Sequence, residues 1–246
     1  MHRITLLFAL TVLVGVSAAP AAEPLDNLKT LMPKDLAEKV TPKVGIDFWP
    51  GIDGELRMVT STKVNGKGSI TEALGRPGKA IIAVMADIDL EGQTIGIPSE
   101  VTLTGRFADM PPQILRGQVV INSSNVRVDQ LAFRPGDLKM IKAVWEPVSL
   151  IVTGKGTKNV VISNCSLTWG VDGNAAVMSK IADGIDGAPS DVLFYRCLIG
   201  QSLHRCPTHR KNRAGDGRSC GLLINDFCQR VGVVECMPQQ TFFNRP

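Results

Sequence analysis

One pattern of residues returns at nearly constant intervals in the second half of this 246-residue chain. Each copy is a short run of apolar, mostly β-branched residues that leads into a polar turn. The copies begin at Asn125, Asn159, Asp191 and Arg230, at intervals of 34, 32 and 39 residues. Six positions after these starts stand Leu131, Cys165, Cys197 and Cys236. Intervals of this length are typical of stacked repeats, in which each repeat is one structural unit that lies on the one before it.

The residues between the repeats indicate which kind of stack to expect. From residue 80 onward, strand-like runs are separated by glycine, asparagine or proline, and no helix-length apolar pattern lies between them. The runs lie at 80–84, 94–97, 101–104, 119–121, 126–128, 150–152, 160–162, 192–194, 222–224 and 231–234. A sandwich or barrel is the alternative, but the only Asn-Gly hairpin signal is at Asn65 and Gly66. The sequence therefore predicts an all-β fold, a right-handed parallel β-helix, whose stacking places the six-position residues in one inward-facing column.

The N-terminal third has a different character. Residues 1–21 combine Arg3, an apolar run and small residues ending in Ala19-Pro20-Ala21, which is the pattern of a secretory signal peptide. The apolar run is shorter than the ~20 residues that a membrane-spanning helix needs. Ser69 and Glu72 form a capping box, which predicts a short helical cap. We therefore expect a protein secreted to the extracellular space or periplasm, with no membrane span.

Three segments follow from these signals. Residues 1–21 form the signal peptide, residues 22–78 an N-terminal cap and first-rung region, and residues 79–246 the parallel β-helix domain. The strand pattern is lost after residue 234, so we expect the β-helix to be incomplete at its C-terminal end.

The charge of the chain favours an anionic partner. The formal net charge is +4, and aromatic residues make up 5% of the sequence. A nucleic-acid-binding surface usually interleaves basic residues with aromatic ones, and no such stripe is present. We therefore expect an acidic polysaccharide as partner, bound by a monomer, and no nucleic acid.

The six cysteines all lie beyond residue 164. In a secreted chain an even number of cysteines favours disulfides, and the preferred pair is Cys206 with Cys220, which bracket a polar loop. A structural zinc site is the weaker alternative, because the chain contains no Cys-x-x-Cys pair. Cys165, Cys197 and Cys236 are interpreted as small buried residues of the stack.

Seven segments, in order and with approximate spacing, resemble the pectate lyase superfamily of right-handed parallel β-helices. They are GSITEAL, AIIAVMADIDLEG, IPSEVTLTG, LAFRPGD, NVVISNCSLTWGVDGN, DVLFYRCLIGQSL and SCGLLIND. The resemblance covers residues 45–234. It implies a secreted enzyme that cleaves polygalacturonate by β-elimination, with calcium bridging protein carboxylates and the uronate carboxyl group. A hard divalent cation there neutralises the carboxylate beside the proton that has to be removed.

The resemblance also implies roles for particular residues. Asp172 stands at the first acid of the family's Asp-Gly-x-x-Asp turn, while the position of the second acid is Ala176. Glu146, on the preceding repeat, stands where relatives have an acid before a strand. Asp172 and Glu146 are therefore the implied calcium ligands. The catalytic arginine of the family is expected beyond residue 234, and Arg245 is the candidate for that role.

The insertion after Gly200 is strongly basic. His204 and Arg205 fall near a substrate-binding lysine of the family, and Lys211 and Arg213 follow in the same insertion. We expect these four side chains to bind uronate carboxylates, because cationic groups pair with carboxylates. A solvated basic loop is the alternative interpretation.

Two other functions remain open at this point. One is a β-helix module that binds acidic polysaccharide without turnover, because Ala176 replaces an expected acid. The other is a glycoside hydrolase on the same fold, which would need paired acids; Asp183 and Asp186 are the nearest pair and have the pattern of a turn.

Overall fold

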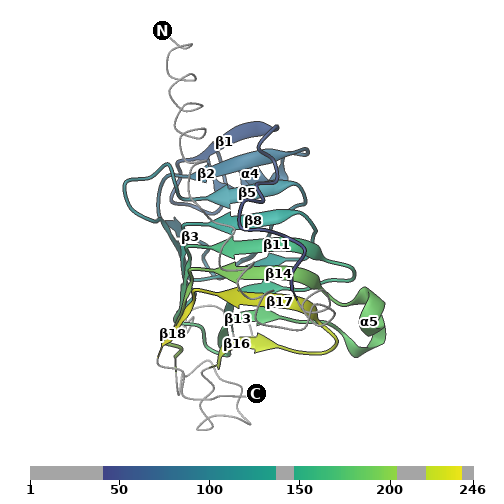
Figure 1. Ribbon diagram of the computed structural model, residues 1–246. Helices are drawn as coiled ribbons and strands as arrows, with labels where there is room; N and C mark the ends of the chain where they lie inside the picture. Colours follow the sequence, from purple (N-terminus) through teal and green to yellow (C-terminus); the bar gives the residue numbers. More distant parts are fainter. Residues whose placement is uncertain (1–40, 137–146, 204–219, 240–246) are drawn as a thin grey trace.

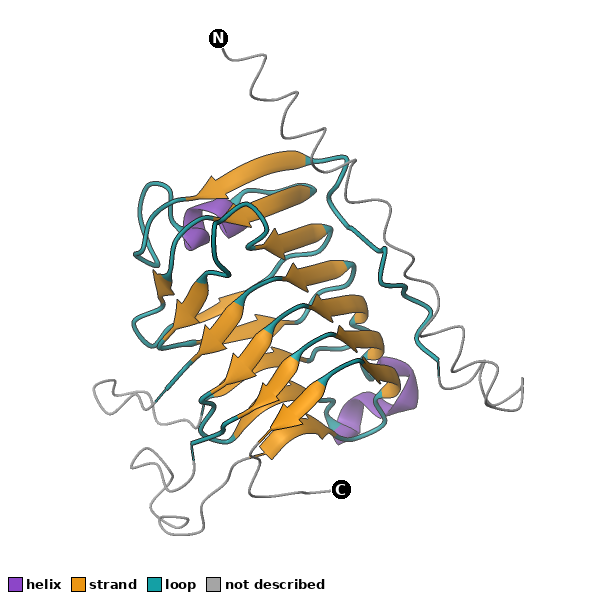
Figure 2. Ribbon diagram, turned by 60° about the vertical axis from the view of Figure 1, so that its left-hand side comes forward, coloured by secondary structure: helices purple, strands orange, loops and turns teal. Residues whose placement is uncertain are grey.

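The computed structural model describes residues 41–136, 147–203 and 220–239. This part of the chain winds into a solenoid whose wall consists of three parallel sheets (Figures 1 and 2). Successive turns supply one strand to each sheet in the same order, and we call one such turn a rung. The fold is a right-handed parallel β-helix, as the sequence predicted.

Sheet A is the longest of the three. Its strands are β1 (Glu55–Val59), β2 (Ala80–Val84), β5 (Val101–Thr104), β8 (Val126–Asp129), β11 (Lys158–Ser163), β14 (Ser190–Tyr195) and β17 (Gln229–Val234). Sheet B contains β3 (Ile88–Asp89), β6 (Gln113–Leu115), β9 (Ala132–Arg134), β12 (Ser166–Thr168), β15 (Leu198–Gly200) and β18 (Met237–Gln239). Sheet C contains β4 (Thr94–Gly96), β7 (Gln118–Ile121), β10 (Val148–Val152), β13 (Gly173–Val177) and β16 (Cys220–Ile224). Every predicted strand overlaps a strand of sheet A or sheet C.

The four repeat starts occupy one corner of the solenoid. Asn125, Asn159, Asp191 and Arg230 directly precede equivalent residues of neighbouring sheet A strands, and their φ angles are 59°, 57°, 55° and 48°. Asparagine and aspartate enter this left-handed region more readily than most residues. The side-chain amide group of Asn159 also donates a hydrogen bond of 2.9 Å to the side-chain oxygen of Asn125. The repeat therefore marks a left-handed corner that turns the chain into sheet A.

The predicted inward-facing column is confirmed. Backbone hydrogen bonds of 2.8–3.0 Å join the rungs at Leu131, Cys165 and Cys197, each of whose carbonyls accepts from the rung below. Both cysteines are buried in the main core, and Cys236 packs against them. A hydrogen bond with the Cys165 side chain and burial raise the pKa of the Cys197 thiol, so this thiol stays protonated. Cys206 lies outside the described residues, so its pairing with Cys220 stays a prediction.

A short helix closes the first end of the solenoid. Helix α4 (Ile70–Gly75) begins at Ser69, whose hydroxyl accepts a hydrogen bond of 3.2 Å from the Glu72 amide. The Glu72 carboxylate in turn accepts from the amide of Gly68. This confirms the predicted cap, although the return bond goes to the residue before the N-cap rather than to the N-cap itself.

Arg57 joins this helix to the first strand. It lies on the inner face of β1 and is 3% exposed. Its guanidinium donates to the carbonyls of Ala73, Arg76 and Pro77 at 2.8–2.9 Å. These carbonyls lie at the C-terminal end of α4, where a helix leaves acceptors without internal partners. The Arg57 guanidinium therefore satisfies the carbonyls at the C-terminal end of α4 and closes the interior at this end.

The segment before β1 crosses the outer face of sheet A, and we call residues 42–54 the strap (Figure 1, dark purple). Its Lys43 amide donates to the Asp191 carboxylate at 2.9 Å, and Val44 packs on β11, β14 and β17. Further along, the Pro50 carbonyl accepts from Thr102 of β5 at 2.7 Å. The sequence did not predict the strap, because it has no strand or helix periodicity.

Two expectations about the last rungs can be compared with the structure. The strand pattern was expected to end after residue 234, but β18 pairs with β15, so this expectation is wrong for Met237–Gln239. Asp183 and Asp186 lie in η2 (Ile181–Asp183) and α5 (Gly184–Gly187), which form the connection from β13 to β14.

No helix in the described ranges is long and apolar enough to cross a membrane.

Candidate functional site

The connections from sheet B to sheet C differ greatly in length. The chain takes residues 135–147 to pass from β9 to β10, residues 169–172 from β12 to β13, and residues 201–219 from β15 to β16. The connections from sheet A to sheet B, in contrast, take two or three residues on each rung except the one from β5 to β6, which takes residues 105–112. Insertions that leave the strands unchanged are typical of places where a rigid scaffold carries functional residues. This B–C edge is therefore the candidate site.

Two backbone hydrogen bonds stack these connections on one another. The Val171 amide donates to the Pro147 carbonyl at 2.9 Å, and the Leu203 amide donates to the Gly170 carbonyl at 2.9 Å. The bonded residues are chain neighbours of Glu146, Asp172 and His204. The structure therefore brings together the described neighbours of three predicted site residues from three successive rungs.

The turn before β13 has a demanding geometry. A Cβ atom on Gly170 would lie 1.7 Å from the Gly173 carbonyl oxygen, so only glycine fits. Asn174 is fully buried, and its side-chain oxygen accepts from the Gly170 amide at 2.9 Å. The Asn174 amide group donates to the Gly200 carbonyl at 2.8 Å and to the Ser202 hydroxyl. Asn174 thus holds the turn and ties it to the next rung, which fixes the backbone around Asp172.

Asp172 is half-buried at the bend directly before β13. One outward-facing column of sheet C consists of Gly96, Val120, Ile151, Ala176 and Leu223. None of these five is acidic. Within the described residues, no three His, Cys, Asp or Glu side chains gather closely enough to hold a metal ion. In this part of the chain, Asp172 is therefore the predicted ligand that the structure places at the B–C edge.

An arginine and a tryptophan that the sequence analysis missed also lie here. The Arg134 guanidinium lies 5.8 Å from the centroid of the Trp169 ring. It donates to the Phe133 and Ser166 carbonyls and to the Ser166 hydroxyl, each at 2.9 Å. The Trp169 side chain is 46% exposed. Its backbone has a φ of 61°, in the left-handed region. The sequence could not predict that Arg134 and Trp169 are neighbours. Their proximity becomes clear only when β9, which ends at Arg134, is seen to pair with β12, which Trp169 follows.

The remaining predicted site residues lie outside the described part of the chain. They are Glu146, His204, Arg205, Lys211, Arg213 and Arg245. Their roles remain predictions.

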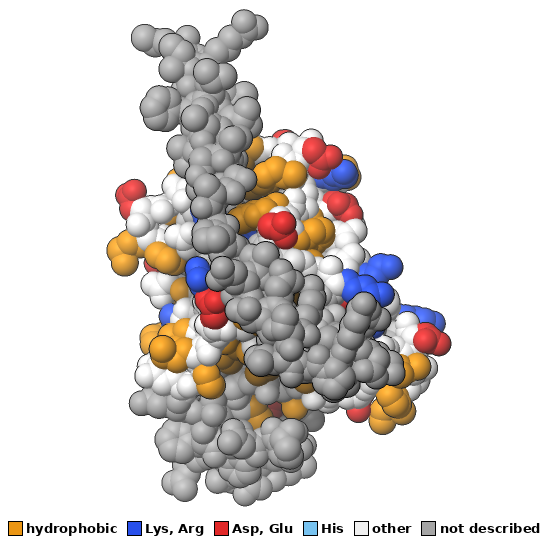
Figure 3. Space-filling view, in the orientation of Figure 1, with side chains coloured by type: hydrophobic (Ala, Val, Ile, Leu, Met, Phe, Trp, Pro, Cys, Tyr) orange, Lys and Arg blue, Asp and Glu red, His pale blue; other side chains and the backbone are white. Residues whose placement is uncertain are grey.

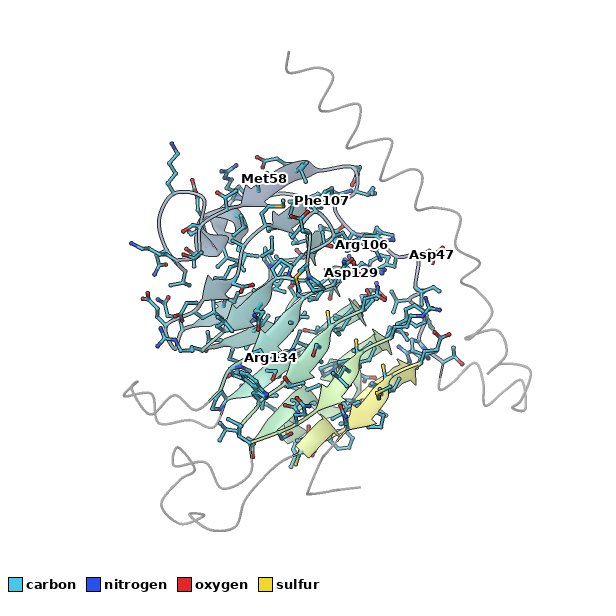
Figure 4. The ribbon with its side chains drawn as sticks, turned by 90° about the vertical axis from the view of Figure 1, so that its left-hand side faces the viewer. Asp47, Met58, Arg106, Phe107, Asp129 and Arg134 are labelled. Carbon is cyan, nitrogen blue, oxygen red and sulfur yellow. The ribbon has the colours of Figure 1, made fainter. Side chains whose placement is uncertain are left out.

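A second charged cluster lies on sheet A beneath the strap, well apart from Arg134 (Figure 4). Its centre is Asp129, which is fully buried. The Asp129 carboxylate accepts hydrogen bonds from Arg106 at 2.5 Å, from Ser163 at 2.6 Å and from Asn164 at 2.9 Å. Because the acid is buried and fully engaged, this cluster is structural and not a substrate site.

Arginines link this cluster to the strap. Arg127, which is 2% exposed, donates to the Ile46 and Phe48 carbonyls at 2.7 and 3.0 Å. The Trp49 ring lies over the Arg127 guanidinium at 3.8 Å and over the Arg106 guanidinium at 5.0 Å. Cation–π contacts of this kind gain strength when the cation is desolvated. The strap is therefore held by buried charges on sheet A.

We expect the stability that Asp129 provides to be lost in acid. Burial raises its pKa, but the hydrogen bond from Arg106 and the charges of Arg127 and Arg106 outweigh burial, so the pKa lies below its ordinary value of 3.8. Stabilisation is therefore complete above that value and falls as the pH drops through the lower folded-state pKa. The free energy of unfolding, measured with urea, should fall between pH 7 and pH 3. The fall should be smaller in Asp129→Asn than in the unmodified chain. Equal losses in both would contradict the assignment.

No protein-family model matches this sequence, and a search of curated proteins finds no match to it.

Proposed function

We propose that this chain is a secreted polysaccharide lyase that cleaves a pectate-type acidic glycan by calcium-assisted β-elimination. A parallel β-helix is compatible with a protein that acts on polysaccharides. The observation that carries the proposal is the stacking of the B–C connections, in which Val171 bonds to Pro147 and Leu203 to Gly170. This stacking supports a site shared by Glu146, Asp172 and His204, which are the chain neighbours of the bonded residues.

The donor chemistry of this edge fits calcium in part. Asp172 offers a half-buried carboxylate on a backbone that Gly170 and Asn174 hold in place. Calcium takes six to eight oxygen ligands, so Asp172 and Glu146 would hold it together with other oxygens. Bound there, calcium would neutralise the uronate carboxylate and so make the adjacent C–H group more acidic.

The described residues add a surface for the sugar. The exposed Trp169 face suits an apolar sugar face, and the Arg134 guanidinium supplies positive charge close to it. In the proposal His204, Arg205, Lys211 and Arg213 bind further uronate carboxylates. Arg245, in its neutral form, would accept the proton from the carbon beside the carboxylate while the glycosidic C–O bond at the β position breaks, a role that follows from the family resemblance.

An absorbance assay tests the proposal. Purified protein with polygalacturonate and calcium should produce a rise in ultraviolet absorbance, because β-elimination leaves an unsaturated product. Chelation of calcium should stop the rise, and added calcium should restore it. Absence of any rise, with and without calcium, would refute the lyase.

A specific observation favours a second candidate, a module that binds acidic polysaccharide without turnover. The outward column of sheet C that contains Ala176 is apolar or glycine throughout, and Ala176 stands where the family has its second acid. Retention of the protein on immobilised polygalacturonate without any unsaturated product would favour this module. New reducing ends without the absorbance change would instead indicate hydrolysis.

A further inference from the structure

The turn that carries Asp172 depends on one buried side chain, that of Asn174. Asn174 is completely buried, and its oxygen accepts a hydrogen bond of 2.9 Å from the Gly170 amide. The turn is tight, since a Cβ atom on Gly170 would lie 1.7 Å from the Gly173 carbonyl oxygen. A buried amide needs an acceptor, because an unpaired polar group in the interior is costly. Asn174 therefore determines the backbone conformation directly before Asp172.

The same side chain reaches the next rung. Its amide group donates to the Gly200 carbonyl at 2.8 Å and to the Ser202 hydroxyl. The Ser202 hydroxyl in turn donates to the Cys220 carbonyl at 2.9 Å. Ser202 stands near the start of the connection from β15 to β16, and Cys220 directly follows its end. A chain of side-chain hydrogen bonds thus joins the Asp172 turn to both ends of this connection.

Asparagine has the chemistry that this position requires. The network uses its oxygen as an acceptor and its amide group as the donor of two hydrogen bonds. Aspartate has the same shape but, when ionised, offers acceptors only. Because Asn174 is completely buried and these groups are engaged, it orients the turn and does not itself bind a ligand.

The rungs have other bonds that keep them stacked at this turn. The Trp169 amide donates to the Gln201 carbonyl at 3.2 Å, and the Trp169 carbonyl accepts from the Gly136 amide at 3.1 Å. These backbone bonds do not involve the Asn174 side chain. Loss of that side chain should therefore loosen the turn around Asp172 without unfolding the solenoid.

We propose that Asn174 and Ser202 are positioning residues of the calcium site, which hold the turn so that the Asp172 carboxylate is oriented before the ion binds. The inference rests on the proposed function and deepens it. Groups that orient metal ligands from behind raise the affinity for the metal, and their removal typically weakens binding about 10–100-fold. An orienting role thus predicts weaker calcium binding but little change in rate once calcium saturates the site, because Asp172 itself is still present.

Calorimetric titration of the full chain with calcium chloride, without substrate, tests the inference. Asn174→Ala should weaken calcium binding about 10–100-fold. Ser202→Ala should weaken it about fivefold, as expected when one hydrogen bond is lost, whereas Ser202→Thr keeps the hydroxyl and should bind calcium as the unmodified chain does. The double change should be no worse than Asn174→Ala alone, because both residues act through one network.

The absorbance assay gives a second readout. The calcium concentration for the half-maximal rate should rise by the same factors in each variant. The rate at saturating calcium should stay within about twofold of that of the unmodified chain, since only binding is weakened.

Ser179→Ala is the matched control for Ser202→Ala. The Ser179 hydroxyl also donates to a carbonyl, that of Lys180 at 3.2 Å. It lies, however, in the connection that contains α5, which protrudes at the corner between sheets C and A with acidic, basic and apolar side chains on its surface (Figure 3). Its removal should leave the calcium affinity unchanged. Circular dichroism establishes that each variant is folded.

A calcium affinity that is unchanged in both Asn174→Ala and Ser202→Ala overturns the inference, and so does an equal loss in Ser202→Thr and Ser202→Ala. A lower rate at saturating calcium with unchanged affinity also overturns it. If Asn174→Ala fails to fold, the two Ser202 variants decide the question. Calcium binding without unsaturated product refutes the lyase alone, and the calorimetric comparison still decides the positioning role. An unmodified chain that binds no calcium overturns both.

Discussion

Replacing Asp129 with alanine is expected to lower the free energy of unfolding by about 3–5 kcal/mol. The reason is that the change leaves Arg127, which is 2% exposed, without its buried counter-ion. It also removes the acceptor of Arg106, Ser163 and Asn164. Denaturation in urea, followed by circular dichroism, measures the loss.

The matched control for this change is Asp186→Ala. Asp186 is exposed on α5, so its removal should alter the free energy of unfolding by no more than about 0.5 kcal/mol. A loss below about 1 kcal/mol in Asp129→Ala would contradict the role assigned to the cluster. The fluorescence of Trp49 offers a second readout, because its ring lies 3.8 Å from Arg127 and should change surroundings when the strap loosens.

Replacing Asp172 with alanine is expected to slow the proposed lyase reaction by about 100-fold or more. Loss of a carboxylate ligand weakens calcium binding, and stabilisation of transition-state charge by a metal is worth several kcal/mol, with each ~1.4 kcal/mol a factor of ten. Residual activity should no longer rise when calcium is added. Initial rates of unsaturated product formation on polygalacturonate, measured over a calcium series, test both statements.

The same exposed acid serves as control for the activity measurement. Asp186→Ala changes the charge of the chain as Asp172→Ala does, but on the corner between sheets C and A, so its rate and calcium dependence should match the unmodified chain. If Asp172→Ala also keeps its full rate and calcium dependence, Asp172 does not belong to the site.

The repeat was readable in the sequence because it depends on local backbone chemistry. Asn125, Asn159 and Asp191 are residues that tolerate the left-handed region, and each precedes a run that is buried on its inner face. This combination recurs on three successive rungs, and Arg230 takes the same left-handed conformation before the apolar run of β17, so the interval between the copies predicted the rung and the inward column.

The strands of sheet B were missed for a physical reason. They contain only two or three residues each, so no alternation of apolar and polar residues can develop within them. Their pairing is imposed by the strands before and after them. Expecting the strand pattern to stop after residue 234 was wrong for the same reason, since β18 is such a strand.

The candidate site was predicted only in part. The family resemblance singled out Asp172 in the polar turn after Trp169, and the structure places this turn at the B–C edge. The proximity of Arg134 and Trp169, 5.8 Å apart, did not, because these residues are distant in sequence and meet only when β9 lies on β12. The sequence likewise did not distinguish Asn174 from an ordinary turn asparagine. Its hydrogen bonds to Gly170 and Gly200, which tie two rungs together, are evident only in the structure.

The sequence by itself determined the class of fold, the left-handed corner and the inward column, because each depends on residues close together in the chain and repeated on successive rungs. Only the tertiary structure decided which polar residues are buried. Arg127 and Asp129 alternate with valines as surface residues would, and they are enclosed because the non-periodic strap crosses them. The closing of the first end by α4 and Arg57 was likewise decided by packing, because Arg57 meets the carbonyls of residues 16 to 20 positions further along the chain.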